Sequence, residues 1–321
     1  MNERLLGSRG PTVSLVGLGC NNIGGRLDEA RSREVVAASL DAGITLFDTA
    51  DIYPLGAPGV GESLLGKLLG ADRDRVLIAT KSGEGFNADF PAGASRTQLL
   101  KAVDESLARL GTDWIDIYQI HMRDPDTPLR ETVSALADLV DAGKIRYFGV
   151  SNHSAADVAA IGVICQELGC DAFVACQDEY SLADRKVEQE LIPTMIDGGL
   201  GLLPYFPLAG GLLTGKYLAP APEGGVRGRL DYSEKLRDRL LNEPRLEAAQ
   251  RLSAVAEQTG RTMLELALGW LAAQPVVSSI IAGASSRDQV LSNVSAAQTV
   301  LRDEELKLIS PENQVGAARP S

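Results

Sequence analysis

Short apolar runs alternate along the chain with longer segments in which apolar residues recur at helical spacing. The runs are rich in Val, Ile and Leu, which is typical of strands buried on both faces. Their alternation with helical segments indicates βα units around a parallel sheet. The pattern predicts eight strands, at residues 15–19, 45–48, 76–80, 115–120, 147–150, 173–177, 202–206 and 278–281.

The segments between these strands carry signals that end helices. Helical patterns cover residues 31–42, 98–110 and 129–142, and Gly43 and Gly143 directly follow two of them. Glycine is favoured there because the residue after a helix often adopts a left-handed conformation. Eight βα units favour closure over an open dinucleotide-binding sheet, which normally has about six strands. The expected fold class is therefore α/β, as a (β/α)8 TIM barrel.

Two segments depart from the βα repeat. Residues 5–16, interrupted by glycine and proline, predict an N-terminal β-hairpin that covers the bottom of the barrel. After the seventh strand, an insertion from residue 209 to about 242 is rich in glycine, proline and charge, and helical segments follow at 245–258 and 263–273. This insertion is a candidate cofactor clamp. Because no linker or repeat divides the chain, we expect a single domain over residues 1–321.

Charge and composition narrow the class of partner. The formal net charge of −12 repels phosphate backbones and anionic lipid, so we expect neither a nucleic-acid nor a membrane partner. The first residues lack the apolar core of a secretory signal, and the uncharged run 198–215 is interrupted by prolines and glycines. The four cysteines lack CxxC spacing and only two histidines accompany them, which argues against a metal site. We expect a reduced, cytoplasmic protein whose oligomeric state the sequence leaves open.

Four polar side chains follow neighbouring predicted strands. Asp48 and Tyr53 follow the second strand, Lys81 the third and His121 the fourth. Each has a structural explanation by itself, such as a turn cap, a solvated charge, a loop anchor or a core histidine. In a (β/α)8 barrel, however, the ends of all strands meet at one face, which carries the active site. We therefore expect these four residues to converge at the barrel mouth.

These residue types suit the reduction of a carbonyl group. A tyrosine with a pKa near ~10 is a weak acid at neutral pH, but a neighbouring ammonium lowers that pKa toward the working range. Lys81 supplies the ammonium, Asp48 holds it charged, and His121 hydrogen-bonds the substrate oxygen. Tyr53 is then the proton donor, and the hydride has to come from a cofactor. The sequence thus predicts an oxidoreductase acting on a small-molecule aldehyde or ketone.

Seven sequence blocks, taken in order, resemble the aldo-keto reductase family, specifically its bacterial and potassium-channel-β-like branch. The blocks are FDTADIY, GESLLG, ATKSG, IDIYQIH, DPDTPLRETVSALADLVDAGKIRYFGVSN, LAGGLLTGKY and AGASSRDQVLSN. The resemblance spans almost the whole chain. It implies that Asp48, Tyr53, Lys81 and His121 match the catalytic tetrad of the family, in the roles argued above.

The resemblance also implies contacts to a nicotinamide cofactor at the ends of the other strands. Ser151, Asn152 and Gln177 match positions that bind the nicotinamide carboxamide, and Tyr205 matches an aromatic ring that stacks on the nicotinamide. Three residues after the first strand would line the adjacent ribose: Gly19, Cys20 and Asn21. Five match the pyrophosphate loop: Leu208, Gly210, Leu212, Thr214 and Lys216. Five more match positions around the adenosine: Gly283, Ser285, Arg287, Gln289 and Asn293.

The adenosine block departs from the better-known reductases. They have a lysine where this chain has Gly283 and an arginine where it has Gln289. Ser285 and Arg287 still offer a hydroxyl and a positive charge to a 2′-phosphate, the latter as a charge-assisted contact. We expect NADPH as the cofactor, with NADH as the alternative.

Two other interpretations stay open at this point. The chain can be a barrel with little turnover that binds NADP(H) as a regulatory or redox-sensing subunit, as the channel-β resemblance allows; the intact tetrad argues against complete inactivity. A metal-dependent barrel hydrolase is the weaker alternative, because two histidines are few for such a site.

The natural substrate cannot be identified from the sequence, since the loops that form substrate walls vary freely on a constant scaffold. Phe86, Phe90 and Phe206 are candidate apolar wall residues. His153 follows Ser151 and Asn152, and we expect it at the rim of the site.

Overall fold

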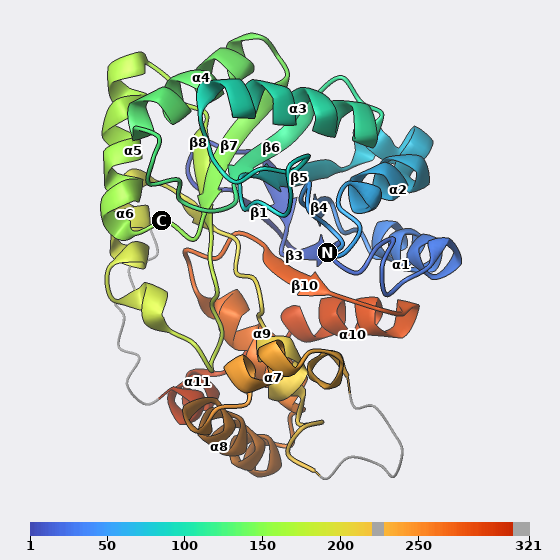
Figure 1. Ribbon diagram of the computed structural model, residues 1–321. Coiled ribbons are helices and arrows are strands. Elements are labelled where there is room, and N and C mark those ends of the chain that lie inside the picture. Colours follow the sequence, from blue (N-terminus) through green and yellow to red (C-terminus); the bar gives the residue numbers. More distant parts are fainter. Residues whose placement is uncertain (220–227, 311–321) are drawn as a thin grey trace.

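The strands form one curled parallel sheet at the centre of the molecule. The computed structural model describes residues 1–219 and 228–310 (Figure 1). Within these residues an eight-stranded sheet has the order β10-β3-β4-β5-β6-β7-β8-β9. Its strands are β3 (Val16–Gly19), β4 (Leu46–Asp48), β5 (Leu77–Ser82), β6 (Ile115–Ile120), β7 (Ile145–Ser151), β8 (Phe173–Gln177), β9 (Gly201–Leu202) and β10 (Ile280–Gly283).

Hydrogen bonds between β9 and the segment entering β10 close the sheet into a barrel. The Leu202 N–H donates to the Val276 carbonyl at 2.8 Å, and the Ser278 N–H donates back to the Leu202 carbonyl at 2.9 Å. Closer to the C-terminal ends of the strands, the Ile281 N–H donates to the Pro204 carbonyl at 3.0 Å. Every strand therefore has a neighbour on both sides, and the predicted (β/α)8 barrel is confirmed.

The seventh barrel strand is shorter than predicted. We expected a strand over residues 202–206, but β9 ends at Leu202. Pro204 has no N–H to donate, and Phe206 has a φ of 49°, which no strand accommodates. The Leu203 and Tyr205 N–H groups nevertheless donate to the carbonyls of β8 and the residue after it, at 2.9 and 3.0 Å. The irregular backbone thus still carries Tyr205 along β8 to the barrel mouth.

An antiparallel hairpin closes the opposite end of the barrel. Its strands, β1 (Glu3–Leu5) and β2 (Thr12–Ser14), pair in antiparallel register. Leu6 and Val13 in this hairpin are fully buried and pack against side chains inside the barrel, among them Leu46 and Ile117. The predicted role of the hairpin as a bottom cover is confirmed, and it makes the barrel a packed core with one open end.

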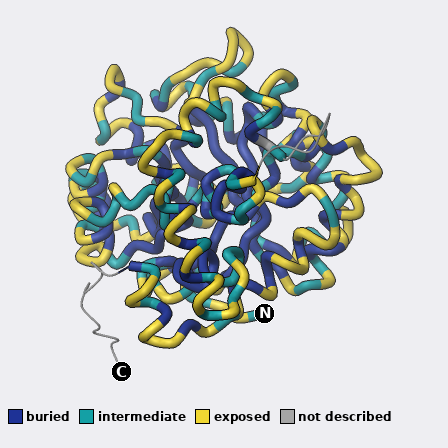
Figure 2. The backbone as a smooth tube through the Cα atoms, turned by 90° about the horizontal axis from the view of Figure 1, so that it is seen from below, coloured by how far each residue is buried: buried dark blue, intermediate teal, exposed yellow. Residues whose placement is uncertain are grey.

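Helices surround the barrel, so that buried backbone lies at the centre of the molecule and exposed backbone at its periphery (Figure 2). The helices are α1 (Glu29–Asp41), α2 (Val60–Leu69), α3 (Arg96–Leu110), α4 (Leu129–Asp141), α5 (Ala155–Leu168), α6 (Leu191–Gly198), α7 (Glu234–Leu240), α8 (Glu243–Thr259), α9 (Met263–Ala273), α10 (Arg287–Ala297) and α11 (Asp303–Ile309). Each helical segment predicted above corresponds to one of them. Gly43 and Gly143 have φ values of 78° and 71° after α1 and α4, as predicted.

The insertion after β9 is built mainly from short helical turns. It contains the 3₁₀ turns η3 (Ala209–Thr214) and η4 (Arg229–Tyr232), followed by α7. Residues 220–227 of the expected insertion lie outside the described residues. Helices α7, α8 and α11 gather at the lower end of the molecule as drawn in Figure 1. Among the helices that the structure describes, none has the length and apolarity that crossing a bilayer requires.

Candidate active site

The four predicted catalytic residues come from adjacent strands of the barrel. Asp48 is the last residue of β4, Lys81 lies within β5, and His121 directly follows β6. Strand β5 pairs with β4 on one side and β6 on the other, so these side chains reach the same mouth. Tyr53 joins them from the loop after β4. We call these four residues the tetrad.

Lys81 and Asp48 form a buried ion pair whose hydrogen-bonding groups are closely matched. The Lys81 Nζ lies 2.7 and 2.8 Å from the two Asp48 carboxylate oxygens and 2.7 Å from the Thr49 carbonyl. The amide of Gln177 donates to the same carboxylate at 2.8 Å. Lys81 is 0% and Asp48 3% exposed. Three acceptors thus take the three ammonium protons, which is the arrangement a buried charge requires.

The Tyr53 ring lies close to both the Lys81 ammonium and the His121 ring. Its centroid is 5.6 Å from the Lys81 Nζ and 5.9 Å from the His121 ring centroid, and the two rings are nearly perpendicular, at 84°. The backbone that carries Tyr53 is fixed by α2: the Gly61 N–H donates to the Tyr53 carbonyl at 3.0 Å. A Cβ on Gly61 would lie 2.9 Å from that carbonyl oxygen. Glycine at position 61 therefore permits the close approach that holds Tyr53 in place.

His121 is buried and neutral at ordinary pH. Burial, and to a smaller extent the charge of the nearby Lys81 ammonium, lower its pKa to about 3. Its Nε2 lies 3.2 Å from a carboxylate oxygen of Glu84, while its buried Nδ1 has no hydrogen-bond partner among the described protein atoms. We did not single out Glu84 from the sequence. Glu84 directly follows the block ATKSG and lies two residues after the end of β5. That position is the sequence signal that could have identified it.

The residues predicted to bind nicotinamide lie against the tetrad. The side-chain amide of Asn152 donates to the His121 carbonyl and to the Ser151 hydroxyl, both at 3.0 Å. The Tyr205 hydroxyl donates to the Asn152 side-chain oxygen at 2.8 Å. Asn152 has a φ of 58°, an uncommon conformation that places its side chain between these groups. The structure thus brings Ser151, Asn152 and Tyr205 into one network next to His121.

Asp178, directly after β8, is a second group that sequence reasoning missed. It is 8% exposed, and burial raises its pKa to about 8, although a backbone N–H from Asn152 opposes the shift. At neutral pH this carboxyl is mostly protonated. The only sequence signal is its place next to Gln177, which we did assign to the site.

The residues after β3 lie beside the ion pair. The Cys20 N–H donates to the Asp48 carbonyl at 2.8 Å. Burial raises the pKa of the Cys20 thiol, and the Asp48 carboxylate raises it further, so the thiol stays protonated and unreactive. The side-chain oxygen of Asn21 is buried without a hydrogen-bond partner within the described protein. Such an orphaned oxygen is suited to accept a hydrogen bond from a ligand hydroxyl.

The predicted pyrophosphate loop consists of η3 and the residues after it. Gly210 and Gly211 have φ values of 68° and 98°, which glycine adopts readily. The Gly211 N–H donates to the Leu208 carbonyl at 2.8 Å and closes the turn, so that N–H is not available to a ligand. The Leu212 side chain is fully buried and packs into the core, so only its backbone is available to a ligand. The Lys216 ammonium has its pKa lowered by burial and by the nearby Arg26 guanidinium. Lys216 and Arg26 therefore place two positive charges near this loop.

The predicted adenosine residues lie at the surface, where β10 leads into α10. The Ser285 hydroxyl donates to the Gln289 side-chain oxygen at 3.0 Å. The Arg287 guanidinium lies 3.4 Å from the Asp41 carboxylate, and both side chains are at least half exposed. Gly283 is also exposed, whereas Asn293 is buried. The structure therefore places these residues on one segment, with all but Asn293 in contact with solvent.

The structure differs from the sequence-based expectation for His153, and it shows the contacts of two candidate wall residues. We expected His153 at the rim, but it is buried, and its Nδ1 lies 2.8 Å from the Ser151 carbonyl. It is thus a histidine satisfied by the backbone. Of the candidate wall residues, Phe90 lies with its ring 5.4 Å from the Arg109 guanidinium on α3, and Phe206 packs on Tyr205.

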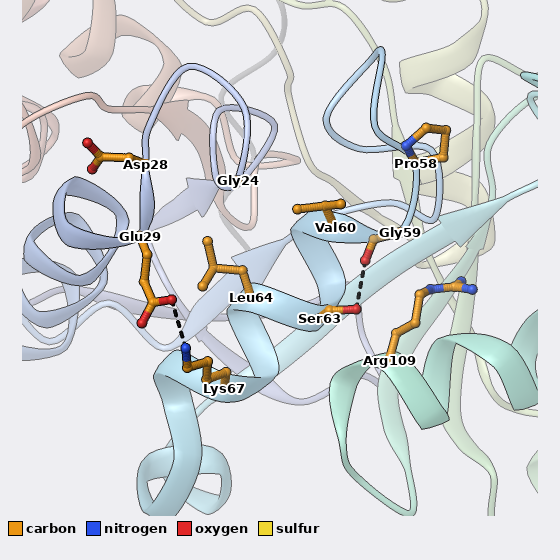
Figure 3. A pocket seen from close by; sticks show the side chains of 10 residues that line it. All are labelled: Gly24, Asp28, Glu29, Pro58, Gly59, Val60, Ser63, Leu64, Lys67 and Arg109. Carbon is orange, nitrogen blue, oxygen red and sulfur yellow. Dashed lines mark hydrogen bonds and ion pairs between the residues drawn. The ribbon is translucent and has the colours of Figure 1, made fainter.

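A groove of about 580 Å³ opens between the β3–α1 loop, the β4–α2 loop and helix α2 (Figure 3). An ion pair between Lys67 and Glu29 spans it at 2.7 Å, and the Ser63 hydroxyl donates to the Gly59 carbonyl within it. Both charged side chains of that pair are about half exposed. None of the four tetrad residues lines this groove, so we do not assign the chemistry to it.

Comparison with known proteins agrees with this geometry. The model of the Aldo/keto reductase family matches residues 15–311. L-glyceraldehyde 3-phosphate reductase of Escherichia coli (strain K12) is 34% identical over 304 residues, covering 92% of this chain and 87% of its own length. A protein of Oryza sativa subsp. japonica named "Probable voltage-gated potassium channel subunit beta" is 33% identical, with coverages of 94% and 92%. "Uncharacterized oxidoreductase YrpG" of Bacillus subtilis (strain 168) is 33% identical, with coverages of 97% and 95%.

Proposed function

Because the chain belongs to the aldo/keto reductase family, it is an oxidoreductase, and we propose that it reduces aldehydes or ketones to alcohols with a nicotinamide cofactor. The observation that carries this proposal is the tetrad, in which a buried Lys81–Asp48 pair lies beside Tyr53 and a neutral His121. The cofactor, when bound, supplies the hydride.

In this proposal Tyr53 donates the proton to the carbonyl oxygen. The Lys81 Nζ lies 5.6 Å from the Tyr53 ring centroid, so a phenolate formed on this ring has a positive charge beside it, which stabilises the phenolate. Asp48 fixes the ammonium by two hydrogen bonds. Neutral His121 donates a hydrogen bond to the carbonyl oxygen, which orients it for proton transfer.

The residues at the other strand ends fit a nicotinamide dinucleotide. The buried, unpartnered oxygen of Asn21 suits a ribose hydroxyl, and Tyr205 presents an aromatic ring beside Asn152. The glycine-rich turn η3 lets a pyrophosphate approach its backbone closely, near the positive charges of Lys216 and Arg26. We propose that these residues, with those already predicted from the sequence, hold the cofactor.

We propose NADPH as the preferred cofactor, with NADH as the alternative cofactor. The Arg287 guanidinium and the Ser285 hydroxyl lie at the N-terminal end of α10, where a phosphate is favoured by the helix dipole and by a charge-assisted contact. The free thiols of all four cysteines support a cytoplasmic location for this reaction.

The substrate we propose is a small carbonyl compound. The Escherichia coli relative is named for L-glyceraldehyde 3-phosphate, a small aldehyde, and an aldehyde of similar size is the first substrate to test on this chain. An alternative function, a cofactor-binding subunit with little turnover, is favoured by the relatives named as channel subunits. One assay separates the two.

That assay follows oxidation of NADPH and of NADH by absorbance, with a panel of small aldehydes, for the native chain and for Tyr53→Phe. We expect turnover by the native chain and a loss of about 10²–10⁴-fold in kcat/KM for the variant. Tyr147→Phe is the control, because Tyr147 packs at the closed end of the barrel and should leave turnover unchanged. Cofactor binding without turnover of any aldehyde would instead support the regulatory subunit.

A further inference from the structure

Glu84 is a charged residue at the tetrad to which the chemistry above assigns no task. It lies in the loop after β5, and its Oε2 is 3.2 Å from His121 Nε2, while its side chain is 41% exposed. One side of the carboxylate thus contacts the buried tetrad and the other faces solvent. Burial raises its pKa, and the Lys81 ammonium opposes the shift.

The contact with Glu84 favours one of the two neutral tautomers of His121. The Glu84 Oε2 and the His121 Nε2 are in close contact at 3.2 Å. An ionised carboxylate attracts an N–H and repels a nitrogen lone pair, so this contact favours the neutral His121 tautomer that has its proton on Nε2. The other ring nitrogen, Nδ1, is buried without a partner among the described protein atoms, so no competing acceptor holds the proton there. Glu84 therefore stabilises the tautomer that is able to donate to a carbonyl oxygen.

The same contact puts a negative charge where the substrate has to bind. The carbonyl oxygen takes its hydrogen bond from His121 Nε2, the atom that Glu84 now contacts. The other charges of the tetrad cancel, because Lys81 is paired with Asp48 and His121 is neutral. A carboxylate or phosphate on the substrate, close to its carbonyl group, would be repelled by Glu84, whereas an uncharged or cationic substituent would not.

We propose that Glu84 is a positioning and specificity-determining residue, which keeps the His121 proton on Nε2 and selects neutral or cationic carbonyl substrates over anionic ones. This inference rests on the proposed function. It assigns the substrate class of the site by charge.

The tautomer is tested by long-range ¹H–¹⁵N correlation of the histidine side chains at neutral pH. The chain has two histidines, and a His153→Gln variant assigns their signals. We expect His121 in the Nε2–H form and His153 in the Nδ1–H form, because His153 Nδ1 faces a backbone carbonyl. An Nδ1–H form of His121 in the native chain would overturn the positioning role.

The selectivity is tested with 4-nitrobenzaldehyde and 4-carboxybenzaldehyde, which are similar in shape and differ in charge. We measure the ratio of their kcat/KM values, neutral over anionic, in the native chain, Glu84→Gln and Glu84→Lys. The ratio should fall by about threefold to tenfold in Glu84→Gln, because unit charges several ångströms apart at a half-exposed site interact with about that energy. It should fall further in Glu84→Lys.

Asp89→Asn is the matched control, because Asp89 is an exposed acidic residue in the same loop; it should leave the ratio unchanged. A ratio that stays constant in both Glu84 variants, while 4-nitrobenzaldehyde is still reduced, would overturn the inference and leave the proposed function intact. Failure of the native chain to reduce either aldehyde with either cofactor would overturn the proposed function, and the inference with it.

Discussion

The tetrad and the surface end of the proposed cofactor site differ in how their charges are held. At the tetrad, Lys81 and Asp48 are buried and three short hydrogen bonds fix the ammonium. At the start of α10, Arg287 faces Asp41 at 3.4 Å with both side chains in solvent. A buried pair that loses one partner leaves an uncompensated charge, whereas an exposed pair loses little. Substitutions should therefore be severe at the first region and mild at the second.

The largest effect is expected for Lys81→Met. Removing the ammonium leaves Asp48 buried without its cation, which should lower the free energy of unfolding by about 3–5 kcal/mol and kcat by about 10²–10⁴-fold. Urea unfolding and steady-state turnover measure the two. Lys67→Met is the control, since the Lys67–Glu29 pair is about half exposed and should contribute less than about 1 kcal/mol. Equal destabilisation by both variants would show that the buried pair contributes no more to stability than an exposed pair.

A smaller effect, with a sign that depends on pH, is expected for Asp178→Asn. The folded state raises the Asp178 pKa from 3.8 to about 8, so between these pH values the folded protein holds a proton that the unfolded chain has lost. This group therefore costs increasing stability as pH rises toward 8.

The Asn variant lacks that cost, so at pH 8 it should unfold with a free energy higher by about 1–3 kcal/mol, and near pH 4 it should match the native chain. Denaturant unfolding across this range is the measurement. Exposed Asp113→Asn should shift neither end. If Asp178→Asn were destabilising at pH 8, the buried carboxyl would be ionised and stabilised by its surroundings.

At the surface end, Arg287→Gln should raise the KM for NADPH about tenfold, the effect of losing one charge-assisted contact. The KM for NADH should not change, because NADH lacks the 2′-phosphate. Measuring both cofactors with one aldehyde separates phosphate recognition from a general loss of binding. An equal rise for both would place Arg287 outside the phosphate contact.

The smallest effect is expected for Asp41→Asn. Its carboxylate competes for the Arg287 guanidinium, but an exposed pair contributes less than about 1 kcal/mol. The KM for NADPH should fall by about twofold to threefold at low salt and by less at high salt, where such pairs are screened. A change that is independent of salt would show that the two side chains do not compete electrostatically.

The sequence was informative where a hydrophobic run ends in a polar residue. Asp48 and Lys81 stand out because they interrupt apolar runs, and the barrel geometry then brings them together at one mouth. Glu84 and Asp178 lie among other polar loop residues, so their burial and their neighbours depend on how separate strands pack. His153 was misplaced for the same reason, since its contact is a backbone carbonyl that no residue pattern encodes.

The strand pattern had a similar limit. Residues 202–206 read as one apolar strand, yet Pro204 and the positive φ of Phe206 end the regular pairing after Leu202. The apolar character of a segment predicts that it is buried in the core. Whether it forms a strand depends on its backbone hydrogen bonds. The order and number of the barrel strands did not depend on that distinction.

The two ends of the sheet meet at the two-residue strand β9, where regular pairing consists of a single bridge between Leu202 and Val277. Local opening of the fold therefore has its natural starting point there, and Tyr205 stands at its upper end. A ligand resting on that ring would hold the join together, so the amides of residues 202–205 would exchange with solvent deuterium more slowly whenever the mouth is filled.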